Sequence, residues 1–80
     1  MPIEKITIET SDIRLDGALK YSGLVGTGGE AKYLIQSGYV RVNGAVEIRR
    51  ASRLCPGDRV ELCDEDGSPR VILEIHGGTT

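Results

Sequence analysis

The sequence lacks several residues that would point to common functional classes. It has no tryptophan, no phenylalanine and only three tyrosines, so a sheet that stacks nucleic-acid bases on an aromatic platform is not predicted. No apolar run approaches the roughly 18 residues that a membrane-spanning helix needs. Residues 1–4 show neither the basic nor the apolar region of a secretory signal, so we expect a cytoplasmic protein.

Metal-binding and catalytic side chains are also scarce. Cys55 and Cys63 are the only cysteines and His76 is the only histidine, too few for a four-ligand zinc site, and we expect free thiols. His76 follows a strand pattern and is expected to be a solvated residue rather than a general base. The acidic run 64–66 lacks the glutamate of a calcium loop, because Leu73 stands at that position. The sequence therefore predicts no enzyme, metal site, cofactor or small-molecule substrate.

Charge is what the chain does have, and it is unevenly distributed. The net charge is −2, yet residues 13–60 hold eight basic and four acidic side chains, whereas the remainder holds two basic and eight acidic ones. Such a split within 80 residues, the length of one domain, suggests a polarised surface. The alternative is an ordinary scatter of charges over a solvated surface.

Two short helices are predicted in the first half of the chain. Residues 15–22 carry apolar side chains at spacings of three and four, and Gly23 follows them as a helix stop. The second helix begins at Thr27, which forms a Thr-x-x-Glu capping box with Glu30, and Gly38 ends it.

A β-hairpin is predicted around Asn43-Gly44. The apolar residues on its two arms alternate with polar ones: Val40, Val42, Val46 and Ile48. A two-residue loop would put the two apolar pairs on opposite faces, because a shift of one residue flips every side chain. We therefore expect a three-residue loop, with Gly44 in a left-handed conformation or in a bulge.

Further strands are predicted over 5–9, 59–63 and 70–75, each with apolar residues at alternate positions. Residues 76–80 are expected to form a flexible tail. Residues 1–80 then make a single α+β domain, in which two short helices pack on one side of a small, mainly antiparallel sheet.

This order of motifs resembles the S4 RNA-binding domain, and more closely the small stand-alone bacterial S4-domain proteins. The resemblance covers residues 13–63 and is carried by the following segments: Arg14-Leu15-Asp16, Gly23-Leu24, Thr27 to Lys32, Leu34-Ile35, Gly38, Val40 to Gly44, and Gly57-Asp58. It implies the S4-like (αL-motif) fold. It also implies a monomeric, non-catalytic protein that binds structured RNA, with ribosomal RNA as the expected class.

In that family the RNA-facing groove lies between the second helix and the hairpin. The resemblance and the nearby basic residues give eight candidate RNA-binding residues: Arg14, Thr27, Gly28, Lys32, Arg41, Asn43, Arg49 and Arg50. Many S4 domains begin the second helix with Ser-Arg-x-x-Ala-Arg, where this chain has Thr-Gly-Gly-Glu-Ala-Lys. The loss of one arginine predicts a lower RNA affinity, for which the arginines after the hairpin, including Arg53, are placed to compensate.

Several alternatives stay open. Gly28 and Gly29 suit either a phosphate at the start of a helix or close packing between the helices. Tyr33 suits either a stacked base or a cover for the helix edge. At the level of the whole protein, Gly77-Gly78 also fits a β-grasp sulfur carrier, although such carriers end at the second glycine and Thr79-Thr80 follow here. The acidic loop also fits a protein-interaction module.

Overall fold

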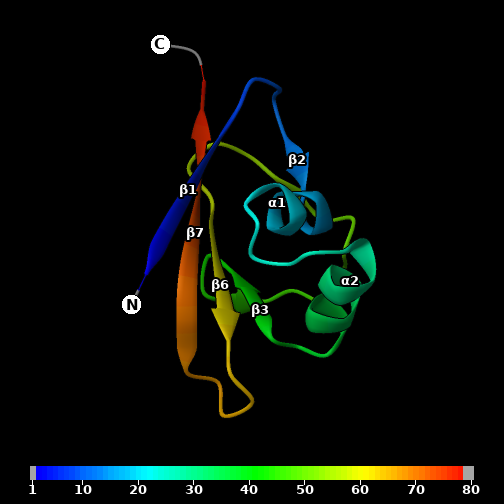
Figure 1. Ribbon diagram of the computed structural model, residues 1–80. Coiled ribbons are helices and arrows are strands. Elements are labelled where there is room, and N and C mark those ends of the chain that lie inside the picture. Colours follow the sequence, from blue (N-terminus) through cyan, green and yellow to red (C-terminus); the bar gives the residue numbers. More distant parts are fainter. Residues whose placement is uncertain (1, 79–80) are drawn as a thin grey trace.

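The computed structural model describes residues 2–78, which form an α+β domain of two helices and seven strands (Figure 1). The elements in chain order are β1 (Ile3–Ile8), β2 (Ile13–Arg14), α1 (Leu15–Tyr21), α2 (Gly28–Gln36), β3 (Val40–Val42), β4 (Ala45–Val46), β5 (Arg53–Leu54), β6 (Arg59–Cys63) and β7 (Pro69–Gly77). The predicted fold class is confirmed, and both helices start and end within two residues of the predicted positions.

Five of the strands form one sheet in the order β1-β7-β6-β3-β4. Its pairs are antiparallel except β1 and β7, which run parallel, so the sheet is mainly antiparallel as predicted. The remaining strands, β2 and β5, pair with each other in a separate two-stranded ribbon. That ribbon was not predicted, because two residues are too few to show an alternating pattern.

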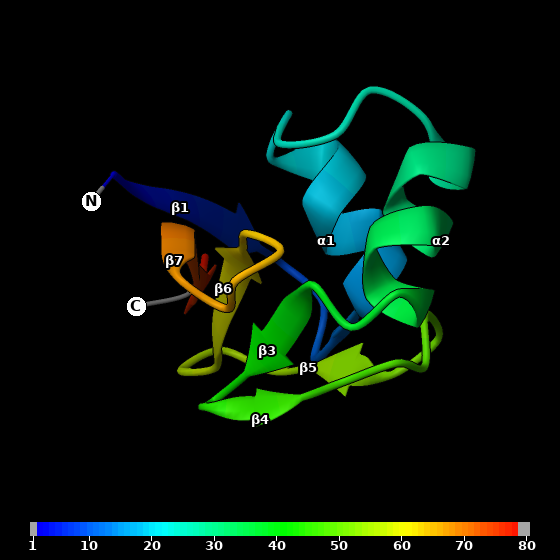
Figure 2. The ribbon, with the colours of Figure 1, turned by 90° about the horizontal axis from the view of Figure 1, so that it is seen from below.

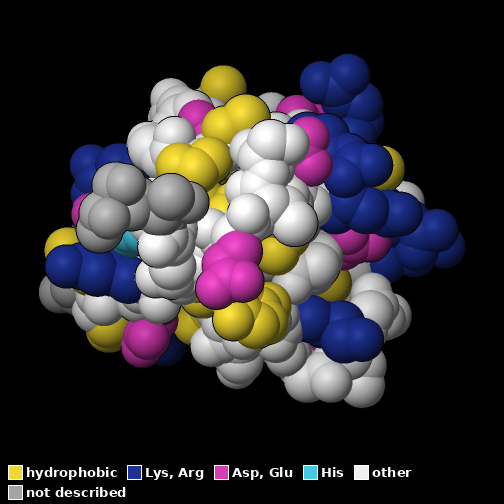
Figure 3. Space-filling view, turned by 90° about the horizontal axis from the view of Figure 1, so that it is seen from above, with side chains coloured by type: hydrophobic (Ala, Val, Ile, Leu, Met, Phe, Trp, Pro, Cys, Tyr) yellow, Lys and Arg dark blue, Asp and Glu magenta, His cyan; other side chains and the backbone are white. Residues whose placement is uncertain are grey.

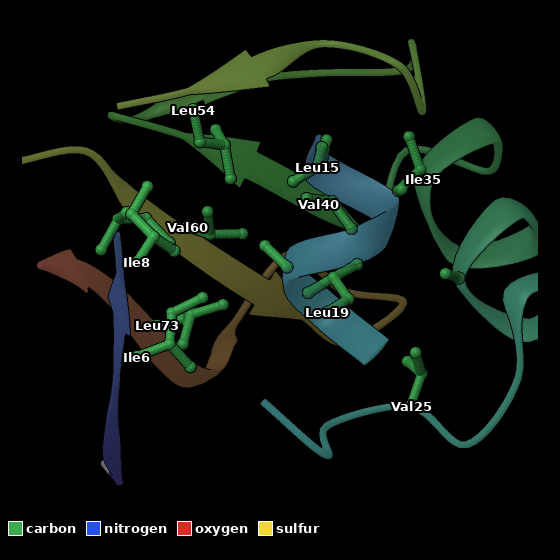
Figure 4. Packing of buried hydrophobic residues seen from close by; sticks show 13 residues of the cluster. Ile6, Ile8, Leu15, Leu19, Val25, Ile35, Val40, Leu54, Val60 and Leu73 are labelled. Carbon is green, nitrogen blue, oxygen red and sulfur yellow. The ribbon is translucent and has the colours of Figure 1, made fainter. Parts of the chain in front are cut away.

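Both helices lie on one side of the five-stranded sheet, with α1 between the sheet and α2 (Figures 1 and 2). The apolar stripe of α1 consists of Leu15, Ala18 and Leu19, and all three are fully buried. Figure 4 shows Leu15 and Leu19 among side chains from the sheet and from α2, such as Val60 and Ile35. Because α1 is buried on two sides, its first turn has a fixed position, and the candidate residue Arg14 immediately precedes that turn.

The hairpin differs from the prediction. Val42 pairs directly with Ala45, so the loop has two residues rather than three. Asn43 and Gly44 have φ angles of 51° and 89°, and positive φ at both positions is what the preferred two-residue hairpin turn requires. The left-handed conformation of Gly44 is thus confirmed, and the three-residue loop is wrong.

The reason lies in contacts that are distant in sequence. The side chain of Asn43 donates to Asp58 Oδ1 at 3.0 Å and accepts from the amide of Arg59 at 2.9 Å, which ties the turn to the start of β6. Because β4 is an edge strand, the apolar residues that follow the turn stay outside the core. Val46 and Ile48 are 57% and 58% exposed.

The expected tail also needs correction. His76 and Gly77 belong to β7, and the amide of Gly78 donates to the carbonyl oxygen of Ile8 at 2.8 Å. Residues 79–80 lie outside the described part of the chain. With its diglycine joined to the sheet and two helices before the hairpin, this part of the molecule does not support the sulfur-carrier alternative.

Candidate nucleic-acid interface

The start of α2 is organised by its own side chains. Thr27 is the N-cap, and its hydroxyl accepts from the amide of Glu30 at 3.1 Å, as the capping box predicts. The carboxylate of Glu30 accepts from the amide of Gly26 at 2.9 Å, one residue earlier than the motif usually provides. These bonds leave the amides of Gly28 and Gly29 without a hydrogen-bond partner within residues 2–78.

The two glycines do not serve close packing. A Cβ added at Gly28 would meet no atom within 4 Å, and one added at Gly29 would meet only the hydroxyl oxygen of Thr27, at 4.0 Å. The close-packing alternative is therefore not supported. Both residues are exposed, so their free amides at the positive end of the helix dipole are accessible to an anion such as a phosphate.

The start of α1 is capped by a segment far along the chain. Arg14 stands at the N-cap in an extended conformation, and its side chain makes no capping bond. Instead, the amide of Leu15 donates to the carbonyl oxygen of Ser52 at 2.8 Å, and that of Asp16 donates to the carbonyl oxygen of Arg50 at 3.1 Å. The first amides of a helix have no partner within it, so the segment after the hairpin supplies their acceptors.

That segment is shaped by Glu47. Its carboxylate accepts from the backbone amide, Nε and Nη2 of Arg49, at 3.1, 3.1 and 3.3 Å, and from the hydroxyl of Ser52 at 3.1 Å. Hydrogen bonds from Arg49 lower the pKa of Glu47 to about 2, with the Ser52 hydroxyl as a smaller cause. Glu47 is therefore ionised at neutral pH and keeps residues 47–52 in a tight turn.

These contacts bring arginines from separate segments to one surface. We call this set the arginine cluster: Arg14, Arg49, Arg50 and Arg53. Arg14 and Arg53 are paired across β2 and β5, and Arg50 adjoins them through its carbonyl bond to α1. Figure 3 shows Lys and Arg side chains gathered on the side of the molecule where β2 and the helices lie.

Three of the four arginines have acidic partners. Arg14 contacts both carboxylate oxygens of Asp16 at 3.1 Å, Arg49 pairs with Glu47, and Arg53 lies 3.2 Å from Asp12. All four side chains belong to exposed residues. Arg50 alone has no ion pair within the described residues, which leaves its guanidinium group free for a ligand.

Two candidate residues lie elsewhere. Arg41 alternates with the buried Val40 and so points to the sheet face opposite the helices, where its guanidinium group lies close to Gly67. Asn43 has its amide group engaged with Asp58 and Arg59, so its polar atoms already serve the turn. Lys32 is exposed on α2.

Tyr33 lies in acidic surroundings. Its ring centroid is 6.3 Å from that of Tyr39, and both rings line a shallow cleft of about 270 Å³ together with Asp64 and Glu65. Burial raises the pKa of Tyr39, and the charge of Glu65 adds to the effect. These carboxylates would repel a nucleic-acid phosphate, so the surroundings favour the alternative in which Tyr33 covers the helix edge.

Sequence reasoning missed the residues that assemble the cluster. Glu47 and Ser52 were not candidates, although a glutamate two residues before an arginine in a turn could have drawn attention. Arg53 was considered only as a replacement for the arginine missing at the start of the second helix. Its ion pair with Asp12 joins residues 41 positions apart, and no local sequence pattern could have predicted it.

Other chemistry is sparse in the described residues. Residues 2–78 contain no group of three or more potential metal ligands, and no helix among them is long and apolar enough to cross a membrane. Cys55 and Cys63 are free thiols. His76 is exposed, with Nε2 lying 3.2 Å from Glu74 Oε1.

Comparison with known proteins agrees with this architecture. Small ribosomal subunit protein uS4 of Anaeromyxobacter sp. (strain K) is 38% identical over 66 residues, which make up 81% of this chain and 30% of that relative. Its counterpart from Crocosphaera subtropica (strain ATCC 51142 / BH68) is 36% identical over 66 residues, 81% of this chain and 32% of that relative. The matched stretch thus spans less than a third of either relative. Residues 6–71 match the S4 domain, so the chain belongs to the S4 domain family.

Proposed function

We propose that this protein is a non-catalytic RNA-binding domain that acts as a monomer on structured RNA, with ribosomal RNA as the expected class. The proposed surface consists of the arginine cluster together with Lys32 and the start of α2. The matched relatives are named as ribosomal subunit proteins, and membership of the S4 domain family supports the same class of ligand.

The observation that carries the proposal is the gathering of four arginines on one surface of an otherwise acidic chain. The net charge is −2, but the β2–β5 pair and the turn at 47–52 concentrate positive charge beside the start of α1. A guanidinium group binds phosphate oxygens through paired, charge-assisted hydrogen bonds. Arg50, which has no acidic partner in the described residues, is the first residue we expect to contact a phosphate.

The proposed surface also includes the start of α2. The free amides of Gly28 and Gly29 provide two more donors for a phosphate, and Lys32 adds a positive charge one turn later. Few aromatic side chains are present, and the exposed Tyr33 has acidic neighbours. We therefore propose that recognition depends on phosphates and on RNA shape more than on base identity.

The proposal is tested by measuring RNA affinity as a function of salt. The probes are a folded hairpin fragment of small-subunit ribosomal RNA and a single-stranded oligouridylate of equal length. Four phosphate contacts to the folded RNA should give a log–log slope of roughly −3 to −4, and the single strand should bind more weakly.

Arg50→Glu should reduce affinity for the hairpin without unfolding the protein, because Arg50 is exposed. Salt-independent binding, or equal affinity of wild type and Arg50→Glu, would contradict the proposal. A pull-down with and without ribonuclease tests the remaining alternative, a protein-interaction module, for which captured partners should persist after RNA is digested.

A further inference from the structure

Glu47 combines a peripheral location with unusually complete hydrogen bonding. It follows the edge strand β4, outside the hydrophobic core, yet its side chain is only 16% exposed. Four donors from Arg49 and Ser52 surround its carboxylate. Its own backbone amide donates to the carbonyl oxygen of Val40 at 3.0 Å, which anchors it to the hairpin.

The turn that Glu47 closes has two further tasks. The amide of Ser52 donates to the carbonyl oxygen of Arg49 at 3.1 Å, so residues 49–52 reverse the chain direction. The carbonyl groups of Arg50 and Ser52 then accept from the first amides of α1. The same short turn therefore caps α1 and carries two of the four residues of the arginine cluster.

We propose that Glu47 is a positioning residue for RNA binding, which holds the 47–52 turn against α1 so that Arg49 and Arg50 face the ligand. This inference rests on the proposed function. Arg49 keeps Nη1 outside the hydrogen bonds to Glu47, and Arg50 is held only through its backbone, so both can reach a phosphate while the turn stays fixed.

For the removal of Glu47, a positioning role predicts a change in RNA affinity opposite to the one that simple electrostatics predicts. Removing a carboxylate from a phosphate-binding surface should strengthen binding, since one repulsive charge disappears. If Glu47 positions the turn, its removal should weaken binding instead, because the two arginines lose their fixed geometry. The matched control is Glu65, an exposed glutamate in the β6–β7 loop that has no ion pair within the described residues.

The experiment compares Glu47→Ala, Glu65→Ala and Ser52→Ala by titration with the ribosomal RNA hairpin. Glu47→Ala should bind about tenfold more weakly and Glu65→Ala within about twofold of wild type, where tenfold corresponds to about 1.4 kcal/mol. Ser52→Ala changes no charge and removes one donor to Glu47, so it should weaken binding by a smaller factor in the same direction.

The salt slope separates positioning from general destabilisation. A variant that is only partly folded loses active protein, and its slope stays that of the wild type. A variant whose arginines no longer reach their phosphates should have a log–log slope less steep by about 1. Circular dichroism reports the folded fraction. If Glu47→Ala does not fold, the single variants Glu47→Gln and Ser52→Ala replace it in the comparison with Glu65→Ala.

The Arg50→Glu variant distinguishes failure of the positioning role from failure of the proposed function. If Arg50→Glu weakens binding while Glu47→Ala behaves like Glu65→Ala, the positioning role is wrong and the RNA-binding surface stands. If Arg50→Glu has no effect, the proposed function itself fails. Weaker binding with an unchanged slope in Glu47→Ala would also overturn the positioning role.

Discussion

The arginine cluster and the β6–β7 loop carry opposite charges and lie toward opposite ends of the molecule. In Figure 1, β2 is near the top, whereas the loop between β6 and β7 is at the bottom. Each end is partly neutralised by its own counter-charges: Asp16 pairs with Arg14 at one end, and Arg70 pairs with Asp64 at 2.7 Å at the other. In the described residues, the basic end keeps one charged residue without an ion pair, Arg50, and the acidic end keeps two, Glu65 and Asp66.

The two ends differ in how they are assembled. Asp64, Glu65 and Asp66 are consecutive in sequence, so their proximity needs no fold. The arginine cluster needs the β2–β5 pairing and the capping of α1 before its members meet. Any change that loosens those contacts should disperse the basic surface, whereas the acidic loop would keep its charge. Net charge alone therefore says little about which ligand such a domain binds.

The largest expected effect comes from reversing charge on the proposed RNA-binding surface. Lys32→Glu with Arg50→Glu should weaken binding of the ribosomal RNA hairpin by about 100-fold at low salt, equivalent to about 2.7 kcal/mol. Both residues are exposed, so the melting temperature should change little. Affinity is measured by fluorescence anisotropy and stability by thermal melting.

The matched control reverses the same number of charges elsewhere. Lys5 lies in β1 and Arg70 pairs with Asp64 beside the acidic loop, so Lys5→Glu with Arg70→Glu should affect binding only weakly. Equal losses in the two double variants would show that overall charge governs binding and that the basic end has no special role.

A smaller effect, on the free energy of unfolding, is expected at the turn between β3 and β4, which precedes Arg49 and Arg50 in the sequence. Gly44 has a φ of 89°, and a Cβ there would meet no atom within 4 Å, so the cost of a side chain lies in the backbone alone. Gly44→Val should reduce the free energy of unfolding by at least about 1 kcal/mol, because a β-branched residue tolerates this conformation poorly. Urea denaturation measures the change, and Ala45→Val, on the exposed edge strand, is the control. A Gly44→Val variant as stable as wild type would contradict the assigned turn.

The hairpin also shows where sequence reasoning ends. The Asn-Gly pair and the capping box are local signals, and both predicted real structure at the correct residues. The loop length depended instead on Asn43 bonding to residues 15 and 16 positions away. The alternation of apolar residues favoured burial of Val46, but no residue pattern reveals which strand will lie at an edge of the sheet.

In the candidate site, too, local features were predictable from the sequence and long-range contacts were not. Lys32 lies off the apolar stripe of the second helix in the sequence, and the structure places both Lys32 and Arg50 among the exposed residues. The location of Arg41 could have been inferred, since it alternates with two apolar neighbours that face the helices. The pairing of Arg14 with Arg53 could not, because two-residue strands have no period and their contact depends on the rest of the fold.

A further prediction concerns the pH dependence of the basic end. The pKa of Glu47 is about 2 in the folded protein, against an ordinary value of 4.5. A lowered pKa contributes stability that is fully present above the ordinary value and is lost as the pH falls toward 2. The stability advantage of wild type over Glu47→Gln should therefore shrink between pH 5 and pH 2, as followed by urea denaturation.

Arg49 provides the control for this titration, because hydrogen bonds from Arg49 are the largest cause of the lowered pKa. In Arg49→Ala, the contribution of Glu47 to the pH dependence should be reduced as well. If the difference in unfolding free energy between wild type and Glu47→Gln were constant over the whole pH range, folding would not lower the pKa of Glu47, and the prediction would be wrong.

The smallest expected effect comes from adding a charge to the proposed RNA-binding surface rather than removing one. Gly28 stands at the first position of α2, and a Cβ added there would meet no atom within 4 Å, so a side chain can leave the backbone without a clash. Gly28→Arg should tighten binding of the ribosomal RNA hairpin severalfold and make the log–log salt slope steeper by about 0.7–0.9, the contribution of one phosphate. Gly28→Ala is the control, because it removes the flexibility of glycine without adding charge. If both variants tighten binding equally, the gain comes from a firmer helix; if only Gly28→Arg does so and its slope steepens, the start of α2 contacts the phosphate backbone.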